Sequence, residues 1–294
     1  MIELLKKRYG WEEAIIDQNG LVQTNRGLKR IHYWYDSALM KWHIDWRDNC
    51  NVTPYVIMDR MLRTIDGSAY VQLDDCMVTV HDEIKDAYGQ IGHEENWGCF
   101  LGRMIECGRK HNVKKKWEKL QFEQLNDRLK NVSKDHRDQI NGFIREAQKR
   151  TTNVFKLIGD NEVNMPVMDW LETPASGKGI FGVLVVNGSD QKPVEGYESL
   201  IRFLNKWLIA HGQESFHTLL DNMNRVAVLT KEEQRVLLAE SLRVQELESL
   251  LHLVKEDDED EMEKLIQRTS RQWDETRLFV SNLATWLDGK KVMN

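Results

Sequence analysis

Several residue types and patterns are scarce or missing in this sequence of 294 residues. Four prolines are too few for a collagen-like or proline-rich protein. No apolar run reaches the roughly 18 to 20 residues that span a bilayer, and residues 1–10 lack the apolar core of a signal peptide. We therefore expect a cytoplasmic protein with no membrane partner.

Cysteine motifs are also missing. None of the four cysteines forms a C-x-x-C pair, so neither a structural zinc site nor a dithiol redox centre is indicated. We expect buried free thiols at all four positions, which are Cys50, Cys76, Cys99 and Cys107.

Charged residues are abundant, and acidic residues slightly outnumber basic ones. Charged residues make up 30% of the chain, and the formal net charge is −6. A nucleic-acid partner is therefore not expected, because such proteins usually present a strongly basic face. A chain of this length can bury a large core, as one large domain or two lobes. The sequence leaves the oligomeric state open, although the tryptophans at 34, 42 and 46 make self-association a weak hypothesis.

The first 80 residues predict a small β-rich unit. After a short helix over 2–9, residues 14–16 and 21–24 flank Asn19-Gly20, which is a strong signal for a β-hairpin. A third strand is expected over 28–33 and a helix over 36–48. Residues 61–64 and 69–73 predict a second hairpin, and 76–80 another strand.

The rest of the chain predicts a larger, mostly helical lobe. Apolar residues recur at helical spacing from about residue 96, for example at Ile140, Phe143, Ile144 and Ala147. A short β insertion is expected near 154–186, from the apolar runs 154–158 and 181–186. We predict an α+β fold with a β-rich lobe over 1–80, a connection over 81–95 and a helical lobe over 96–294. A cleft between two lobes is a common place for a ligand.

Five segments together resemble a known family. They are LLKKRYG at 4–10, TNRGLKR at 24–30, MLRTIDGSAYV at 61–71, FLGRM at 100–104 leading to His111, and the helical region 219–237. This order is similar to that of the aminoglycoside phosphotransferases and choline kinases, which have a two-lobed protein-kinase-like fold. The kinase-like proteins associated with the spore coat of Bacillus relatives are the most similar subfamily. The resemblance implies ATP and Mg²⁺ as cofactors and a nucleotide as partner.

The resemblance also assigns roles to particular residues. Lys29 matches the strand lysine that holds nucleotide phosphates, although an exposed strand lysine is the simpler interpretation. The segment Gly159-Asp160 to Asn164 is similar to the catalytic loop H-G-D-x-x-x-x-N, with Asp160 as base and Asn164 as metal ligand. The match is imperfect because Ile158 replaces the histidine and Asn164 comes one residue early. An ordinary turn is the alternative for this segment.

The second metal position of the family shows a further departure. Its aspartate follows a strand, and the matching position here holds Asn187. An amide brings only a dipole to Mg²⁺, whereas a carboxylate brings a full charge. Asp190 lies three residues later and could substitute, but Asn187-Gly188 is also a plain turn signal.

Three functions follow from these observations. The first is a pseudokinase or binding scaffold with a protein partner, for which the resemblance implies a place in the spore coat. The second is an active ATP-dependent small-molecule phosphotransferase. The third is a helical interaction protein, with a phage origin as one option, that uses the acidic run 256–261 or its tryptophans.

Other charged motifs have simpler explanations. Ser176-Gly177-Lys178-Gly179 lacks the pattern of a phosphate-binding loop and predicts a surface turn. The runs 81–83 and 93–95 lack the H-E-x-x-H spacing of a zinc site, so we interpret them as solvated charge in a linker. The basic run 114–117 is interpreted as a solvated helix face, and the acidic run 256–261 as an exposed loop or helix start.

Overall fold

A computed structural model describes residues 1–84, 88–118, 122, 129, 133–171, 183–247, 250 and 259–291. The chain forms two compact units. The first unit contains residues 1–111, 167–194 and 218–228, and the second contains 112–166, 195–217 and 229–294. No helix in the described part of the chain is long and apolar enough to cross a membrane.

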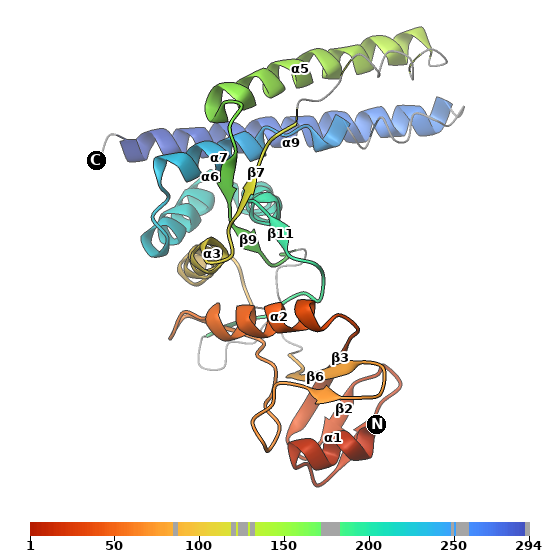
Figure 1. The fold of residues 1–294 in the computed structure, drawn as a ribbon. Helices are drawn as coiled ribbons and strands as arrows, with labels where there is room; N and C mark the ends of the chain where they lie inside the picture. The colour runs from red at the N-terminus through yellow and green to blue at the C-terminus, as the bar shows by residue number, and fades with distance from the viewer. Residues whose placement is uncertain are drawn as a thin grey trace. The chain divides into compact units, whose positions relative to one another are not determined.

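A five-stranded antiparallel sheet organises the start of the first unit. The predicted helix at the start is confirmed as α1, Ile2–Tyr9, and Figure 1 shows it beside the sheet. The hairpin predicted at Asn19-Gly20 is also confirmed, with Gly20 at a φ of 80°. The sheet order is β1-β2-β3-β6-β5. The strands are β1 Ala14–Ile16, β2 Val22–Thr24, β3 Gly27–Trp34, β5 Val71–Gln72 and β6 Met77–Asp82.

The two faces of this sheet carry different chemistry. Directly opposite residues of antiparallel strands share a face, and β3 pairs with β6 so that Lys29 faces Asp82 and Arg30 faces His81. The Lys29 face contains Ile31 and Val80, which pack with Leu5 and Tyr9 of α1. The opposite face contains Arg30, His32 and Trp34 in the same strand. Neighbouring residues of β3 therefore serve two different environments.

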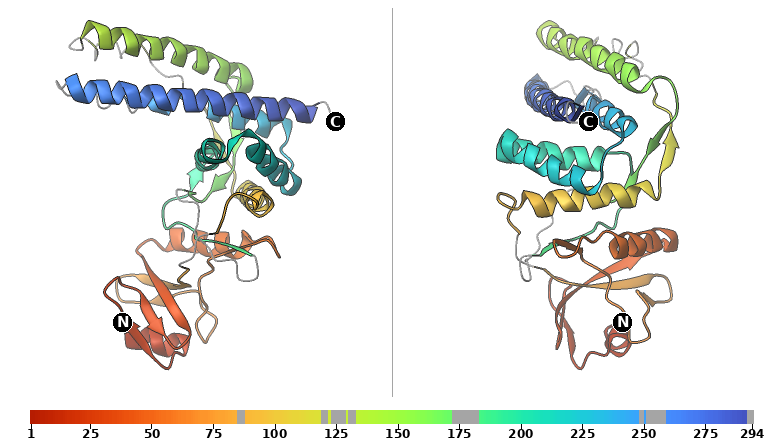
Figure 2. Two further views of the ribbon diagram at one scale, coloured as in Figure 1. Left: turned by 180° about the vertical axis from the view of Figure 1, so that it is seen from behind. Right: turned by 90° about the vertical axis from the view of Figure 1, so that its left-hand side faces the viewer.

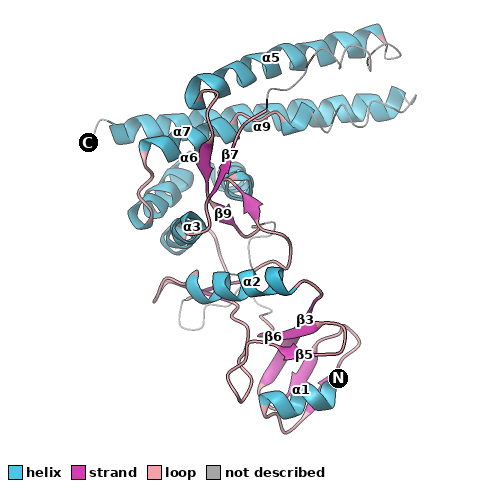
Figure 3. Cartoon of the chain, viewed as in Figure 1, coloured by secondary structure: helices cyan, strands magenta, loops and turns pink. Residues whose placement is uncertain are grey.

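Further elements complete the first unit. Helix α2, Ser37–Asn49, is capped by the Asp36 carboxylate and packs against β3. Strand β4, Val56–Met58, pairs in parallel with β10, Leu184–Val186. Helix α3, Glu94–Arg109, packs against β4 and β9, Val167–Met168. Figure 3 labels β9 beside α3.

The second unit is mostly helical. Its two-stranded antiparallel sheet pairs β7, Val113–Lys115, with β8, Val163–Met165. Helix α7, Lys231–Ser241, begins with a capping box between Thr230 and Glu233. The remaining elements are α5 Lys134–Ile158, β11 Val194–Glu195, α6 Glu198–Val226 and α9 Glu259–Lys291. Helix α6 breaks at Gly212, and β11 and α6 each contribute residues to both units.

Long helices form the core of the second unit. Helix α5 lies beside α9, as all views in Figures 1 and 2 show, and also packs against α7. Ile140, Ile144 and Ala147 of α5 are buried with Trp273 of α9, which confirms the predicted amphipathic pattern. The guanidinium of Arg150 lies 4.2 Å from the centre of the Trp273 ring, so a cation–π contact joins the same two helices.

Two secondary-structure predictions are wrong. Residues 154–158 are the last turns of α5 rather than a strand, because a short apolar run fits either a buried strand or a buried helix face. Residues 61–64 are outside any strand, although the Leu62 N–H donates to the Val80 carbonyl and the Thr64 N–H to the Ser68 carbonyl. The predicted second hairpin is therefore replaced by a turn at 64–68.

Candidate functional site

A loop that follows β10 is the centre of the candidate site. It contains Asn187 and Asp190, two of the residues predicted to bind a metal. The parallel pairing of β10 with β4 brings this loop beside Asp59, because the Asp59 N–H donates to the Val186 carbonyl over 2.8 Å. Asp59 directly follows β4, and its side chain is almost completely buried.

Asp59 is held by several donors. Its Oδ1 accepts from the Gly188 N–H at 2.8 Å and from Arg47 Nε at 3.2 Å, and its Oδ2 accepts from Arg30 at 2.5 Å. His81 lies 3.4 Å from the same Oδ2. Burial alone would raise the pKa of Asp59, but Arg47, His81 and Arg30 together lower it to about 2. The carboxylate is therefore charged, with both oxygens already engaged.

Arg47 ties helix α2 to the loop. Its NH2 group donates to the Ser189 carbonyl at 2.7 Å, and its NH1 group lies 3.0 Å from His43 Nδ1. An arginine can only donate, so His43 Nδ1 accepts and His43 Nε2 carries the proton that is given to the Gln191 carbonyl at 2.8 Å. Burial lowers the pKa of His43, which agrees with a neutral ring.

A second buried carboxylate holds the loop from another side. Asp169 follows β9, and its Oδ2 accepts from the Ser189 N–H at 2.9 Å. Its Oδ1 accepts from the Ser189 hydroxyl at 2.5 Å and from the Trp170 N–H at 2.9 Å. Both oxygens of Asp169 are therefore also engaged, and Ser189 is fixed by its backbone and its side chain.

His32 and Asp190 form the more open part of the site. Their Nδ1 and Oδ2 atoms are 3.6 Å apart, and 61% of the Asp190 side chain is exposed. Burial lowers the pKa of His32 to about 4, helped by the nearby His81 and arginines, so the His32 ring is neutral near pH 7. Asn187 presents a buried Oδ1 with no hydrogen-bond partner. The Asn187 Oδ1 and the Asp190 carboxylate are therefore the oxygen atoms of this loop that remain available to a ligand.

Lys29 lies on the other face of β3. Its Nζ is 2.5 Å from Asp82 Oδ1 and also donates to the Arg26 carbonyl, and its side chain is buried. The interpretation of Lys29 as an exposed strand lysine is therefore wrong. Arg30, the next residue, points to the face that holds Asp59 and lies 3.8 Å from Glu83.

The other two predicted residues belong to the second unit. Asp160 is exposed in the turn that follows α5, and Asn164 is an exposed residue of β8 opposite Lys114. The loop after β10 thus brings together Asn187 and Asp190. In the described ranges, no group of three histidine, cysteine or acidic residues is arranged to hold a metal ion.

Sequence reasoning missed several members of this site. Asp59, Asp169, Arg47 and His81 were not selected, and the interpretation of His81 as solvated linker charge is wrong. His81 is the next-to-last residue of β6 and is buried, and its Nδ1 lies 2.9 Å from the Asp59 carbonyl oxygen. The available signal was an aspartate directly after a short apolar strand, which occurs at both Asp59 and Asp169.

Comparisons with known proteins identify the fold. No protein-family model matches the chain, and no curated protein matches its sequence. An aminoglycoside phosphotransferase from Alicyclobacillus acidocaldarius superposes with a TM-score of 0.61 at 11% identity, covering 97% of this chain and 95% of that one. Spectinomycin phosphotransferase APH(9)-Ia, in complex with ADP and spectinomycin, superposes with a TM-score of 0.55 at 12% identity, covering 97% of both chains.

These matches confirm the predicted fold class. The chain has an α+β fold of the protein-kinase-like type, in the form found in aminoglycoside phosphotransferases. The likeness extends over nearly the whole length of the chain, so it covers the β-rich start and the helical remainder alike.

Proposed function

We propose that this protein is a pseudokinase or binding scaffold that holds a nucleotide without efficient phosphoryl transfer. The proposal rests on the ion pairs and hydrogen bonds that two buried carboxylates beside the loop after β10 already make. The charge of Asp59 is balanced by ion pairs with Arg30 and Arg47. Both oxygens of Asp169 accept hydrogen bonds from Ser189 or Trp170. Asn187 stands where the family resemblance expects an aspartate.

The donor set does not fit a magnesium site. Mg²⁺ prefers charged oxygen ligands in a compact octahedral arrangement. At this loop the free oxygens are the amide Oδ1 of Asn187 and the largely exposed carboxylate of Asp190. Two arginines also lie beside Asp59, and their positive charge opposes a nearby cation. A nucleotide phosphate, in contrast, would be attracted by the same arginines.

Nucleotide binding is supported by the structural neighbours. One of them is a complex with ADP and spectinomycin, and the match covers 97% of that chain. Lys29 stays the predicted phosphate ligand from sequence, but its ammonium is already paired with Asp82. Arg30 is the second candidate, because it faces the same side of the sheet as the loop after β10. We propose that one of these two cations contacts the phosphates.

An active phosphotransferase is the alternative function. It is favoured by the match to phosphotransferases over 95% or more of their length. In that function Asp160 would act as base, and Asn164 with Asn187 or Asp190 would hold Mg²⁺. Asp169 is a rival for the base, because its carboxylate, like that of Asp59, contacts the loop of Asn187. Activity that survives Asp160→Ala but not Asp169→Ala would decide between these two residues.

A protein partner and a location in the spore coat are further parts of the proposal. They rest on the family resemblance alone. The third function, an interaction protein, uses the acidic run 256–261, of which residues 256–258 are outside the described range. Its last two residues, Asp260 and Glu261, are exposed near the start of α9, where the helix dipole favours acidic side chains.

Calorimetric titration with ATP, with and without Mg²⁺, tests the proposal. We expect saturable binding whose dissociation constant changes less than about threefold when Mg²⁺ is replaced by EDTA. Arg30→Gln and Lys29→Gln, which carry the same loss of charge, identify the cation that contacts the phosphates. Strong magnesium dependence together with turnover would favour the active phosphotransferase. Absence of binding at millimolar ATP would favour the interaction protein.

A further inference from the structure

A separate cavity lies within the second unit. It has a volume of about 310 Å³, which is within the usual range for a small-molecule site. The strand β7 ends at one wall with Lys115, helix α5 provides Thr151 and Val154, and the end of α7 provides Glu240. None of the residues discussed above as nucleotide or metal ligands lines this cavity.

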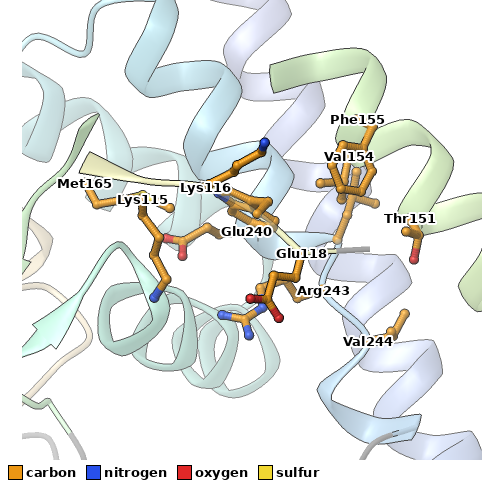
Figure 4. A pocket seen from close by; sticks show the side chains of 12 residues that line it. Lys115, Lys116, Glu118, Thr151, Val154, Phe155, Met165, Glu240, Arg243 and Val244 are labelled. Carbon is orange, nitrogen blue, oxygen red and sulfur yellow. The ribbon is translucent and has the colours of Figure 1, made fainter. Parts of the chain in front are cut away.

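The cavity has an apolar wall and a charged wall. In the view of Figure 4, Val154 and Phe155 of α5 lie on one side, and Lys115, Glu240 and Arg243 lie on the other. Apolar ligand atoms would be favoured on the first side because they leave water. The second side can recognise one polar group of the same ligand.

The indole of Trp117 gives an independent indication of a ligand. Trp117 lines the cavity, and its buried Nε1–H has no hydrogen-bond partner. A buried donor without a partner costs free energy, so a ligand that accepts this bond would be stabilised. The guanidinium of Arg243 lies 5.7 Å from the centre of the Trp117 ring. Two donor groups, one of them charged, therefore lie together at the cavity.

The charges of the lining favour an anion. Three cations, Lys115, Lys116 and Arg243, line the cavity with two carboxyls, Glu118 and Glu240. Glu240 is buried and accepts a hydrogen bond from the Tyr197 backbone N–H. Its burial raises the pKa of Glu240 to about 7, although Arg243 and Lys115 oppose this shift, so the group carries only part of a charge near neutral pH.

We propose that this cavity binds a small amphipathic monoanion, such as an aliphatic or aromatic carboxylic acid. The anionic group is paired with Arg243 and accepts the Trp117 N–H, whereas Lys115 already lies 3.4 Å from Glu195. The apolar body packs against Val154 and Phe155. This site does not depend on the proposed nucleotide function, because it is built from different residues.

Fluorescence titration with 8-anilinonaphthalene-1-sulfonate tests this proposal on the full chain. We expect saturable binding with one molecule per chain. Arg243→Gln should weaken binding by about tenfold, as expected for the loss of a charged hydrogen bond. The matched control Arg268→Gln, which removes an exposed arginine of α9 outside the cavity, should bind like the wild type.

Two further comparisons identify where the dye binds and which ligand charge the cavity prefers. Thr151→Trp should block the cavity because Thr151 lines it and is only half-buried, whereas Thr152→Trp on the neighbouring exposed position should not. Octanoate should displace the dye, and octylamine should not. Circular dichroism melting confirms that each variant is folded. Wild-type affinity in both Arg243→Gln and Thr151→Trp, or displacement by octylamine alone, would overturn the proposal.

Discussion

Arg47 of helix α2 donates a hydrogen bond to the carbonyl oxygen of Ser189 over 2.7 Å, although the two residues are 142 positions apart in the sequence. Through this bond and its bond to Asp59, a single guanidinium connects α2, the end of β4 and the loop after β10. The loop predicted to carry a metal ligand is thus held by hydrogen bonds from protein groups.

Gly188 is required by this arrangement. A Cβ atom at this position would lie 2.6 Å from Arg47 Cζ, well inside van der Waals contact. Arg47 is almost completely buried, and its guanidinium is held by Asp59 and by the Ser189 carbonyl. We therefore expect Gly188→Ala to reduce the free energy of unfolding by about 1–3 kcal/mol.

Chemical denaturation of the purified variant measures this loss. The matched control is Gly89→Ala in the same unit, where the nearest atom to an added Cβ is 3.4 Å away. Equal stability of the two variants would mean that Arg47 does not fill the space beside Gly188.

Asp59 should be important for stability and for its dependence on acid. Asp59→Asn keeps the shape of the side chain but leaves Arg47 and Arg30 without their counter-charge. Breaking such a buried pair typically costs about 3–5 kcal/mol. The exposed turn residue Asp74 offers a control, Asp74→Asn, which should change stability by less than about 0.5 kcal/mol.

The pH dependence has a definite sign. The pKa of Asp59 is lowered to about 2 in the folded chain, from 3.8. The folded state therefore binds fewer protons than the unfolded state between these values, and stability is lost as the pH falls from about 4 to about 2. Unfolding measured over this range should show a steeper loss in the wild type than in Asp59→Asn.

Local sequence patterns predicted much of the first unit. The hairpin predicted from Asn19-Gly20 is confirmed, because its turn needs a positive φ and glycine supplies it at position 20. The four cysteines are buried and free, as predicted. Local chemistry decides these features, so neighbouring residues suffice to predict them. The lobe boundaries at residues 80 and 95 stay predictions.

The candidate site was much harder to predict. The Gly188 N–H and the Asp59 carboxylate meet across 129 positions, and no local pattern links them. Lys29 and Arg30 are adjacent, so only the register of β3 with β6 shows which cation faces Asp59. Similarly, the short apolar run 154–158 is compatible with either a strand or a helix. The structure shows that it forms the end of α5.

Asn187→Asp tests the proposed loss of a metal ligand at this position. The new carboxylate would replace a buried amide oxygen that has no partner and would add the charge that Mg²⁺ prefers. We expect ATP binding to become magnesium-dependent, with the dissociation constant falling about tenfold or more on addition of Mg²⁺. Titration calorimetry compares this variant with Asn19→Asp, an exposed turn substitution in the same unit. An unchanged magnesium response in Asn187→Asp would mean that Asn187 is not at a metal position.

Glu240 should make the protein less stable as the pH rises. Its pKa is raised by burial from 4.5 to about 7, so the folded state binds more protons than the unfolded state between these values. The contribution of Glu240 to the stability of the folded chain is therefore greatest below about pH 4.5. This contribution is lost as the pH rises through about 7. The loss could reach about 3 kcal/mol, since each pKa unit corresponds to about 1.4 kcal/mol.

Glu240→Gln isolates this effect. The amide oxygen of glutamine can still accept the hydrogen bond from the Tyr197 N–H, but it carries no charge at any pH. The variant should be more stable than the wild type at pH 8 and similar to it at pH 5, as measured by urea denaturation at both values. Glu232→Gln, which alters an exposed acid in the first turn of α7, should leave the wild-type slope between pH 5 and pH 8 in place. A parallel pH dependence in Glu240→Gln and wild type would show that Glu240 is ionised in the folded chain across this range, so that its burial is compensated by Arg243 and Lys115.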